Sequence, residues 1–210
     1  QDALAPGEPI TLAPPSRGLF ARSRSPEYSI NNWGGTGLMQ TPSARFEKQG
    51  HFSFALSRFY PYINYNVFVN PLDGVEVGFR YTGISNRAYG SNQAGPGQNY
   101  KDKSIDLRVR LWRESAYLPQ VAIGARDIAG NGFISSEYIV ASKRTGPFDW
   151  SLGIGFGYMA GRQDIRNPFV FLGKSFQTRT GQSSSSQGGG LTFGNYFRGP
   201  GAVSYTHLRA

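Results

Sequence analysis

The stretch Phe148-Asp-Trp-Ser-Leu-Gly-Ile-Gly-Phe-Gly-Tyr158 alternates between two kinds of side chain. Its even positions carry Phe, Trp, Leu, Ile, Phe and Tyr, whereas the odd positions between them carry Asp, Ser or Gly. Because side chains of a β-strand point alternately to the two faces of its sheet, this pattern predicts a strand. One face of that strand would be large and apolar, and the other small or polar.

Six further segments share this period of two, and almost no helical period accompanies them. They are His51–Arg58, Tyr60–Val69, Val75–Tyr81, Ile105–Leu111, Gln120–Asp127 and Phe133–Lys143. Together with the first stretch they predict seven strands and an all-β fold. The connections Gly83–Lys103 and Met159–Gly190 are long and rich in Gly, Asn, Gln and Ser. Both follow an odd-numbered strand, so we expect them to leave the sheet at one end.

A soluble β-sandwich and a transmembrane β-barrel both produce such alternation, but two features favour the barrel. Full charges such as Arg108 and Arg110 occupy the polar face in mid-strand, as in the lining of a wet lumen, and aromatic residues cluster near strand ends. Segment lengths of about 8–11 residues also match a bilayer crossed at a tilt near 45°. We therefore expect an antiparallel up-and-down transmembrane β-barrel, incomplete, with about 7–8 strands of a larger barrel.

The composition excludes several other classes of protein. The 210 residues include 28 Gly and are 14% aromatic, a mixture poorly suited to helical bundles and too aromatic for a disordered chain. The longest apolar runs have four residues, whereas a membrane-spanning helix needs about 20. The net charge of +9 is spread along the chain without a dense basic run, so it does not predict a nucleic-acid partner.

Few residues could carry out chemistry. The chain has no cysteine and only two histidines, His51 and His207, which argues against thiol nucleophiles, zinc sites and histidine triads. The run from Gly155 to Ala160 matches a dinucleotide-binding pattern in its letters, but it starts inside a predicted strand and no helix follows. We therefore expect no enzymatic activity, no catalytic residue, no metal site and no cofactor.

Charges on two neighbouring segments predict how those strands pair. Arg80 is expected opposite Asp106, and Glu76 opposite Arg110, because every apolar residue of the other face then also meets an apolar one. This pairing leaves Arg108 without a carboxylate on the neighbouring strand. Arg108 would then be free to contact an acidic or hydroxyl-rich glycan.

The last two predicted strands pair with Lys143 opposite Asp149 and Val140 opposite Leu152. One row of charged residues then lines the lumen. This row is the candidate surface for glycan contact, and the alternative is that its residues only stabilise the barrel by pairing with one another. The row consists of Glu76, Arg80, Asp106, Arg108, Arg110, Arg126, Glu137 and Lys143, and the outer-loop aromatics Tyr89 and Tyr100 would extend it.

The two ends of the chain differ from its middle. Residues 1–30 are rich in Pro, Ala and Ser and are predicted to be a disordered periplasmic extension, followed by the barrel portion over residues 31–200. Residues 201–210 continue no earlier pattern and resemble the translated adapter sequence of a metagenomic fragment. We expect this tail to be non-native and the natural protein to continue beyond it.

Four runs in this order resemble the YjbH family of exopolysaccharide-associated outer-membrane proteins. They are Trp33–Arg45, Gly78–Arg87, Leu118–Asp127 and Ser135–Lys143, and the resemblance covers about residues 31–200. It implies β-barrel modules in the outer membrane, a role in making or exporting an extracellular polysaccharide, and no catalytic residues. Family members are often described as lipoproteins, but this sequence has no lipobox cysteine, so lipidation stays open.

We therefore expect a non-enzymatic outer-membrane β-barrel protein of a Gram-negative bacterium, implicated in exopolysaccharide production or export. Its expected partners are outer-membrane lipid, exopolysaccharide and other proteins of the secretion operon, and not nucleic acid. One alternative is an outer-membrane barrel with an unrelated transport or anchoring role. Another is a secreted polysaccharide-modifying β-protein, which a carboxylate pair without a basic partner would favour.

Overall fold

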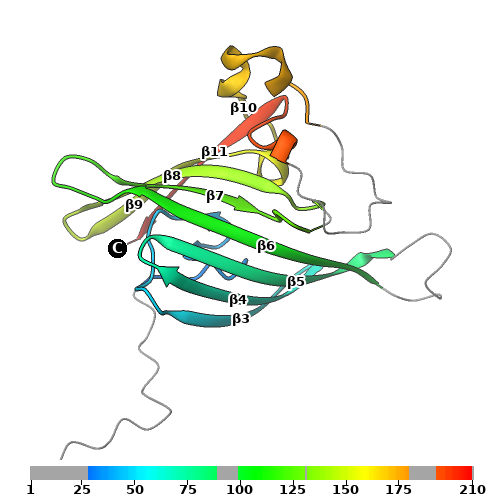
Figure 1. Ribbon diagram of the computed structural model, residues 1–210, viewed down its shortest axis with the longest axis horizontal. Coiled ribbons are helices and arrows are strands. Elements are labelled where there is room, and N and C mark those ends of the chain that lie inside the picture. The colour runs from blue at the N-terminus through cyan, green and yellow to red at the C-terminus, as the bar shows by residue number, and fades with distance from the viewer. Residues whose placement is uncertain (1–27, 89–98, 131, 180–192, 210) are drawn as a thin grey trace, which may run out of the picture.

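The computed structural model describes residues 28–88, 99–130, 132–179 and 193–209, and most of these form one curved sheet (Figure 1). Within the described residues this sheet has nine antiparallel strands in the order β10-β11-β9-β8-β7-β6-β5-β4-β3. They are β3 (Phe52–Phe59), β4 (Tyr62–Leu72), β5 (Val75–Ala88), β6 (Asn99–Trp112), β7 (Gln120–Arg126), β8 (Ser136–Thr145), β9 (Phe148–Gly155), β10 (Ile165–Arg166) and β11 (Gly201–Arg209). From β3 to β9 each strand lies beside its neighbour in the chain, which is the up-and-down order.

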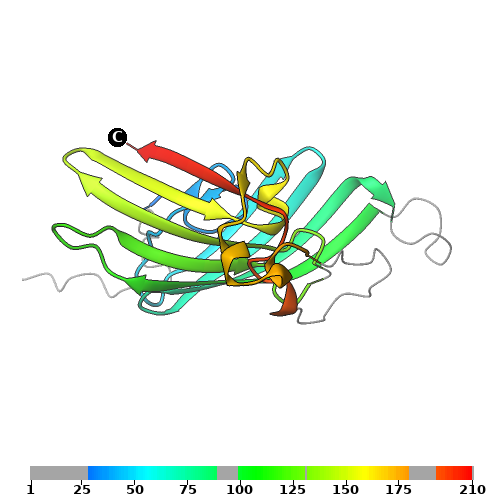
Figure 2. The same cartoon turned by 90° about the horizontal axis from the view of Figure 1, so that it is seen from above.

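Each of the seven predicted segments overlaps a strand, so the prediction of an antiparallel all-β fold is confirmed. The sheet curves around the N-terminal part of the chain (Figure 2). Its curvature brings the hydroxyl of Tyr62 in β4 to 2.7 Å from that of Tyr158, which follows β9. The sheet is nevertheless open, with β3 and β10 at its two edges, so the established fold is a curved sheet rather than a closed barrel.

Several short elements complete the fold. A two-stranded ribbon, β1 (Gly37–Leu38) and β2 (Thr41–Pro42), lies in the N-terminal part, and four 3-10 helices lie between β9 and β11. The helices are η1 (Gly157–Ala160), η2 (Pro168–Leu172), η3 (Lys174–Phe176) and η4 (Phe193–Asn195). In the described part of the chain no helix has the length and apolar character needed to cross a membrane.

Strand β6 shows how the two faces of the sheet differ. Asp102, Asp106 and Arg108 are buried on the inner, concave face, whereas Ile105 and Leu107 between them are exposed on the outer face. This distribution inverts that of an ordinary soluble domain, in which charged residues are almost never fully buried unless they are paired. The inner face must therefore supply partners for its charges.

The pairing of β5 with β6 differs from the prediction by two residues. Glu76 lies opposite Arg108, and Arg80 lies opposite Ser104 rather than opposite Asp106. A slip of two residues leaves every side chain on its own face, so apolar residues still meet apolar ones on the outer side. Arg80 reaches Asp106 diagonally at 2.9 Å, so this predicted ion pair forms in spite of the slip.

The pairing of β8 with β9 differs by one residue, which exchanges the two faces of the strand. Ala141, not Val140, lies opposite Leu152, and Tyr138 and Val140 point inward. A glycine explains this choice. A Cβ atom on Gly124, which lies across from Tyr138 in β7, would be only 2.4 Å from the tyrosine ring. Gly124, which has no Cβ atom, therefore leaves the space that the inward ring of Tyr138 occupies.

The predicted C-terminal tail forms strand β11 beside β9, contrary to the expectation that it continues no pattern. Tyr205 lies over Gly153, where an added Cβ would be 2.1 Å from the ring. The sequence hides this alternation because neither face is uniform: Tyr205 and the polar His207 share the less exposed face, and the exposed positions carry Ser204, Thr206 and the apolar Leu208. That the natural protein diverges near this strand stays a prediction.

Candidate functional site

The inner face of the sheet is covered by residues 29–47, which we call the interior segment. Trp33, Ala44 and Phe46 of this segment are buried, with exposed fractions of 3%, 0% and 8%. A turn at its start is fixed by Asn31, whose Oδ1 accepts a hydrogen bond from the backbone N–H of Trp33 at 2.9 Å. The preceding residues 1–27, predicted to be a disordered extension, lie outside the described residues.

Arg108 of β6 holds the interior segment through its guanidinium group. Its Nη1 donates hydrogen bonds to the carbonyl oxygens of Thr36, at 3.0 Å, and of Ser43. Its Nη2 lies 2.8 Å from Oε2 of Glu76, which also accepts a hydrogen bond from the Thr36 hydroxyl at 3.0 Å. The ring of Phe46 lies 4.3 Å from the guanidinium carbon. The prediction that Arg108 is unpaired is therefore wrong, because the observed register places Glu76 opposite it.

Two further arginines enclose the N-terminal half of the segment. Arg80 pairs with Asp106 at 2.9 Å, and its guanidinium lies 4.8 Å from the ring of Trp33. Arg126 lies 5.6 Å from the same ring and donates to the carbonyl oxygen of Gln40 at 3.4 Å. Ion pairs and cation–π contacts of this kind lower the cost of burying a guanidinium group.

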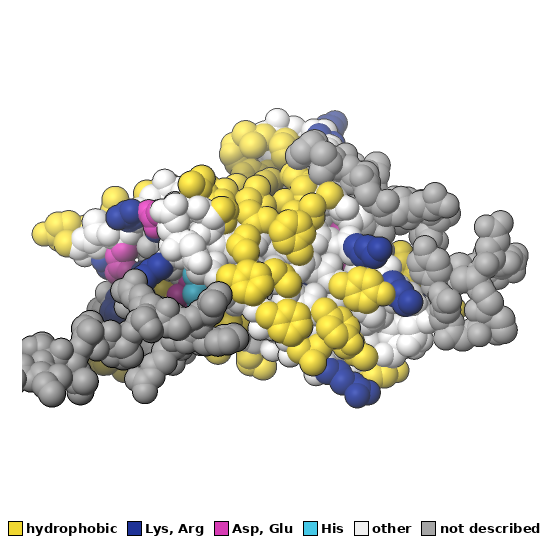
Figure 3. Space-filling model, turned by 60° about the horizontal axis from the view of Figure 1, so that its bottom comes forward, with side chains coloured by type: hydrophobic (Ala, Val, Ile, Leu, Met, Phe, Trp, Pro, Cys, Tyr) yellow, Lys and Arg dark blue, Asp and Glu magenta, His cyan; other side chains and the backbone are white. Residues whose placement is uncertain are grey.

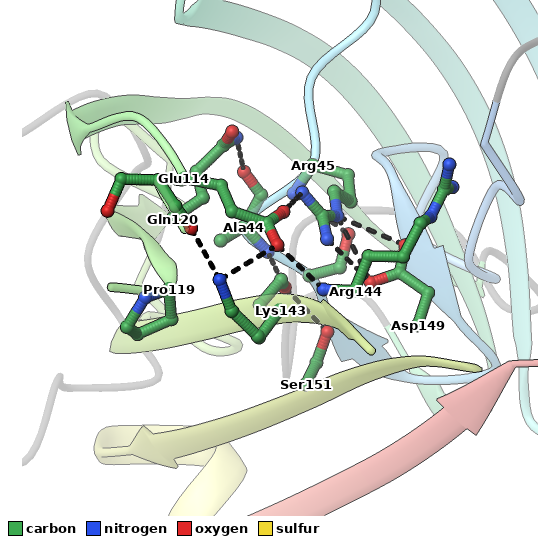
Figure 4. Close-up of polar contacts among 12 residues, drawn as sticks. Ala44, Arg45, Glu114, Pro119, Gln120, Lys143, Arg144, Asp149 and Ser151 are labelled. Carbon is green, nitrogen blue, oxygen red and sulfur yellow. Dashed lines mark hydrogen bonds and ion pairs between the residues drawn. The ribbon is translucent and has the colours of Figure 1, made fainter. Parts of the chain in front are cut away.

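A second group of charges holds the C-terminal half of the segment (Figure 4). Arg45 lies between Asp149 of β9, at 2.7 Å, and Glu114 of the connection between β6 and β7, at 2.6 Å. Lys143 lies 3.5 Å from Glu114, which also accepts a hydrogen bond from the backbone N–H of Arg144. Burial disfavours the charge on Glu114, but the hydrogen bonds from Arg144 and Arg45 outweigh this effect and lower its pKa.

Six members of the predicted lumen row occupy inner-face positions, and their charges meet partners within the fold or lie against the interior segment. These six are Glu76, Arg80, Asp106, Arg108, Arg110 and Arg126. The predicted pair between Glu76 and Arg110 does not form. Arg110 instead pairs with Asp73 in the turn between β4 and β5.

The other predicted site residues lie elsewhere. Glu137 is fully buried on the opposite face of β8, where it pairs with Arg179, because the β8–β9 register differs from the prediction. Lys143 lies near the end of β8 and also donates to carbonyl groups of the β6–β7 connection. Tyr100 is a buried residue of β6 rather than a loop residue, and Tyr89 lies outside the described residues.

This arrangement is suited to holding a peptide segment rather than to proton transfer. Glu76, Asp106 and Asp149 each pair with an arginine. Of these arginines, Arg108 donates to backbone carbonyls and Arg80 stacks on the ring of Trp33. Sequence reasoning missed Trp33, Arg45 and Phe46, because the interior segment has no periodicity. The sequence feature that could have identified them is the run Trp33–Arg45, which resembles the YjbH family. This run ends at the arginine that binds Asp149 and Glu114.

Comparison with known proteins places this geometry in a family. The sequence model of a family described as exopolysaccharide biosynthesis protein YbjH matches residues 29–207. The chain belongs to the YjbH family. The predicted resemblance is thus confirmed, and the match begins where the interior segment begins.

One curated relative matches most of the chain. The "Uncharacterized lipoprotein YjbH" of Escherichia coli (strain K12) is 41% identical over 176 residues, which cover 83% of this chain and 25% of that protein. The chain therefore spans about a quarter of the length of this YjbH relative. No solved structure matches the chain.

Proposed function

We propose that this chain forms part of the wall of an outer-membrane β-barrel that serves exopolysaccharide production or export, without enzymatic activity. The observation that carries the proposal is the apolar outer face, which lies opposite an inner face rich in paired charges. Phe52, Phe54 and Leu56 follow one another along the outer side of β3 and are each more than 60% exposed. Hydrophobic side chains gather on one face of the molecule in the same way (Figure 3).

Along β6 the outer face changes from charged to apolar residues, as expected for a surface that enters a membrane. On β6 the outward positions change from Lys101 and Lys103 to a run of four apolar residues that starts at Ile105 and ends at Leu111. At roughly 3.4 Å per residue this run is about 20 Å long, close to the apolar band of roughly 25 Å that surrounds outer-membrane barrels. Tyr81 lies opposite Lys103 at the edge of the band, where an aromatic girdle is expected.

The contribution to polysaccharide export rests on the family, whose description names exopolysaccharide biosynthesis. The partners proposed are outer-membrane lipid on the outer face, and exopolysaccharide together with other secretion proteins at the ends of the barrel. An outer-membrane location agrees with the lipoprotein name of the Escherichia coli relative. Within this proposal the inner charges hold the interior segment, so a polymer would pass this part of the wall only if the segment moved.

A substitution on the apolar band tests the proposal. Leu107→Arg in the intact gene product should disfavour membrane insertion by about 2–4 kcal/mol, because its charge would face the middle of the bilayer. Lys103→Arg, on the same row but outside the band, should have little effect. The measurement is the amount of heat-modifiable protein in purified outer membranes. A protein that is monodisperse without detergent, with both variants folded equally well, would refute the membrane location.

A further inference from the structure

The described residues between β9 and β10 and between β10 and β11 form a compact unit, which we call the cap. It comprises residues 157–179 and 193–200, and Figure 1 shows η2 and η3 standing beyond β10 and β11. One buried side chain ties it together. Nδ2 of Asn167 lies within 3.2 Å of the carbonyl oxygens of Phe176, Phe197 and Gly199, and its Oδ1 accepts from the backbone N–H of Phe169. Over its described residues, 159–179, the long connection predicted here therefore has a defined fold.

The cap is fastened to β8 by a buried ion pair. Both carboxylate oxygens of Glu137 lie within 2.9 Å of the guanidinium nitrogens of Arg179, and one of them also accepts from the backbone N–H of Phe197. Arg179 additionally donates to the hydroxyl of Ser135 at 2.8 Å. Glu137 is wholly buried, and its charge is neutralised by that of Arg179.

A cavity of about 230 Å³ lies between the cap and the start of β8 and β11. This volume is below the roughly 300–1,000 Å³ of sites that enclose drug-sized ligands, and it suits one ring-sized group. Six side chains of chemical interest line it, namely Phe133, Ser135, Tyr158, Gln163, Arg179 and Arg198, and much of the remaining wall is glycine backbone. The lining thus combines aromatic faces, hydrogen-bonding groups and two cations, and it includes no carboxylate among the described residues.

Of the two cations at this cavity, Arg179 is balanced by Glu137 and Arg198 is not. From Gly157 to Pro200 the sequence has four Arg and one Lys but a single acidic residue, Asp164. Arg198 has no carboxylate within ion-pair distance in the described part of the chain, and its guanidinium lies 5.5 Å from the ring of Phe176. Beyond the cavity wall, Arg87 lies 4.3 Å from the ring of Phe133. A half-exposed guanidinium group beside a ring-sized hollow favours an anion.

The cavity also lies at the aqueous end of the proposed barrel wall. The ring of Phe133 is 5.9 Å from that of Tyr100, close to Lys101 and Lys103, which end the apolar band on β6. A ligand of this cavity would therefore come from water rather than from the bilayer core.

We infer that the cap cavity binds one anionic sugar residue of a polysaccharide, such as a uronic acid. This inference rests on the proposed role in exopolysaccharide export and names the chemical class of the polymer. Arg198 pairs with the sugar carboxylate, Phe133 or Tyr158 packs against the apolar face of the ring, and Gln163 hydrogen-bonds a hydroxyl of the sugar. Arg179, already neutralised by Glu137, positions the wall of the site.

Calorimetric titration of the intact protein in detergent micelles tests the inference, with trigalacturonate as the anionic probe and maltotriose as a neutral one of equal length. Trigalacturonate should bind and maltotriose should not. Arg198→Gln should weaken the binding at least tenfold. Arg162→Gln is the matched control, because this cap arginine does not line the cavity, and it should leave the binding unchanged.

Three results would overturn the inference: no binding of trigalacturonate, equal losses in the two variants, or equal binding of both probes. Binding of lipopolysaccharide, but not of trigalacturonate, that depends on Arg198 would assign the anionic sugar to a lipid and also refute the polysaccharide ligand. The insertion assay with Leu107→Arg is independent of this titration. A failure of the proposed membrane location and a failure of the cavity as a glycan site can therefore be distinguished.

Discussion

The inner face of the sheet and the cap handle positive charge in opposite ways. On the inner face Arg80 and Arg108 each lie within 2.9 Å of a carboxylate and also contact the interior segment, whose own Arg45 lies 2.7 Å from Asp149 of β9. In the cap Arg198 has no such partner among the described residues, and it lines an open cavity. The difference follows from burial, since a buried arginine needs a carboxylate or, as at Arg126, carbonyl and ring contacts, whereas a partly exposed arginine is solvated. A buried, contacted arginine therefore indicates a structural role, and a partly exposed arginine without a carboxylate beside a cavity is a candidate for binding.

The largest effect is expected when a buried arginine of the inner face loses its carboxylate partner. Glu76→Gln leaves Arg108 buried without a carboxylate and should lower the free energy of unfolding by about 3–5 kcal/mol. Urea unfolding in detergent micelles, followed by tryptophan fluorescence, measures this loss.

Asp73→Asn is the matched control for that substitution, because Asp73 pairs with Arg110 two residues along the same strand but is about half exposed. Its effect on stability should be small, since water and salt screen an exposed ion pair. Equal losses in the two variants would mean that the inner pairs have no special structural role.

A smaller effect should come from Asp127, a carboxyl group near the inner charges whose pKa is raised mainly by burial. Asp127, directly after β7, has an Oδ1 atom without a hydrogen-bond partner among the described residues. Burial, and then the charge of Asp102, raise its pKa to about 8, although Arg80 acts in the opposite direction. Because the folded state holds this proton more tightly than the unfolded chain does, stability should fall as the pH rises from about 4 to about 8.

Asp127→Asn should remove this part of the pH dependence. The variant should be more stable than the parent protein at pH 9 and equal to it near pH 4, where both side chains are neutral. Asn also tolerates the positive φ of 58° at this position, so the backbone need not change. Urea midpoints at the two pH values measure the effect, and a variant less stable than the parent at pH 9 would show that Asp127 is charged and paired.

The strands were predictable because alternation identifies them almost independently of context. The pairing of β5 with β6 was not, since Val75 meets an apolar residue whether it lies opposite Val109 or Leu111. Which face of β8 points inward was ambiguous for a similar reason, because both of its faces carry apolar residues. The space beside Gly124, which accommodates the ring of Tyr138, decides between them.

The candidate site was predictable only in part. Glu76, Arg80 and Asp106 were assigned to the right face by alternation, but their partners depend on register, which alternation does not fix. The interior segment was not predictable as a filling of the sheet. Its backbone makes irregular turns, so the sequence has no periodicity that would show which side chains are buried. In the sequence Trp33 therefore cannot be distinguished from an aromatic residue of an exposed loop.

Disulfide cross-linking can show whether the interior segment lies against the inner face of the sheet. This part of the protein has no cysteine that could compete with an introduced pair, and the backbone N–H of Ala44 lies 2.9 Å from the hydroxyl of Ser142. In isolated outer membranes Ala44→Cys combined with Ser142→Cys should form a disulfide readily. Ala44→Cys combined with Ala141→Cys, whose second cysteine faces outward, should not. No cross-link in the first pair, or equal cross-linking in both, would contradict an interior segment held against the inner face.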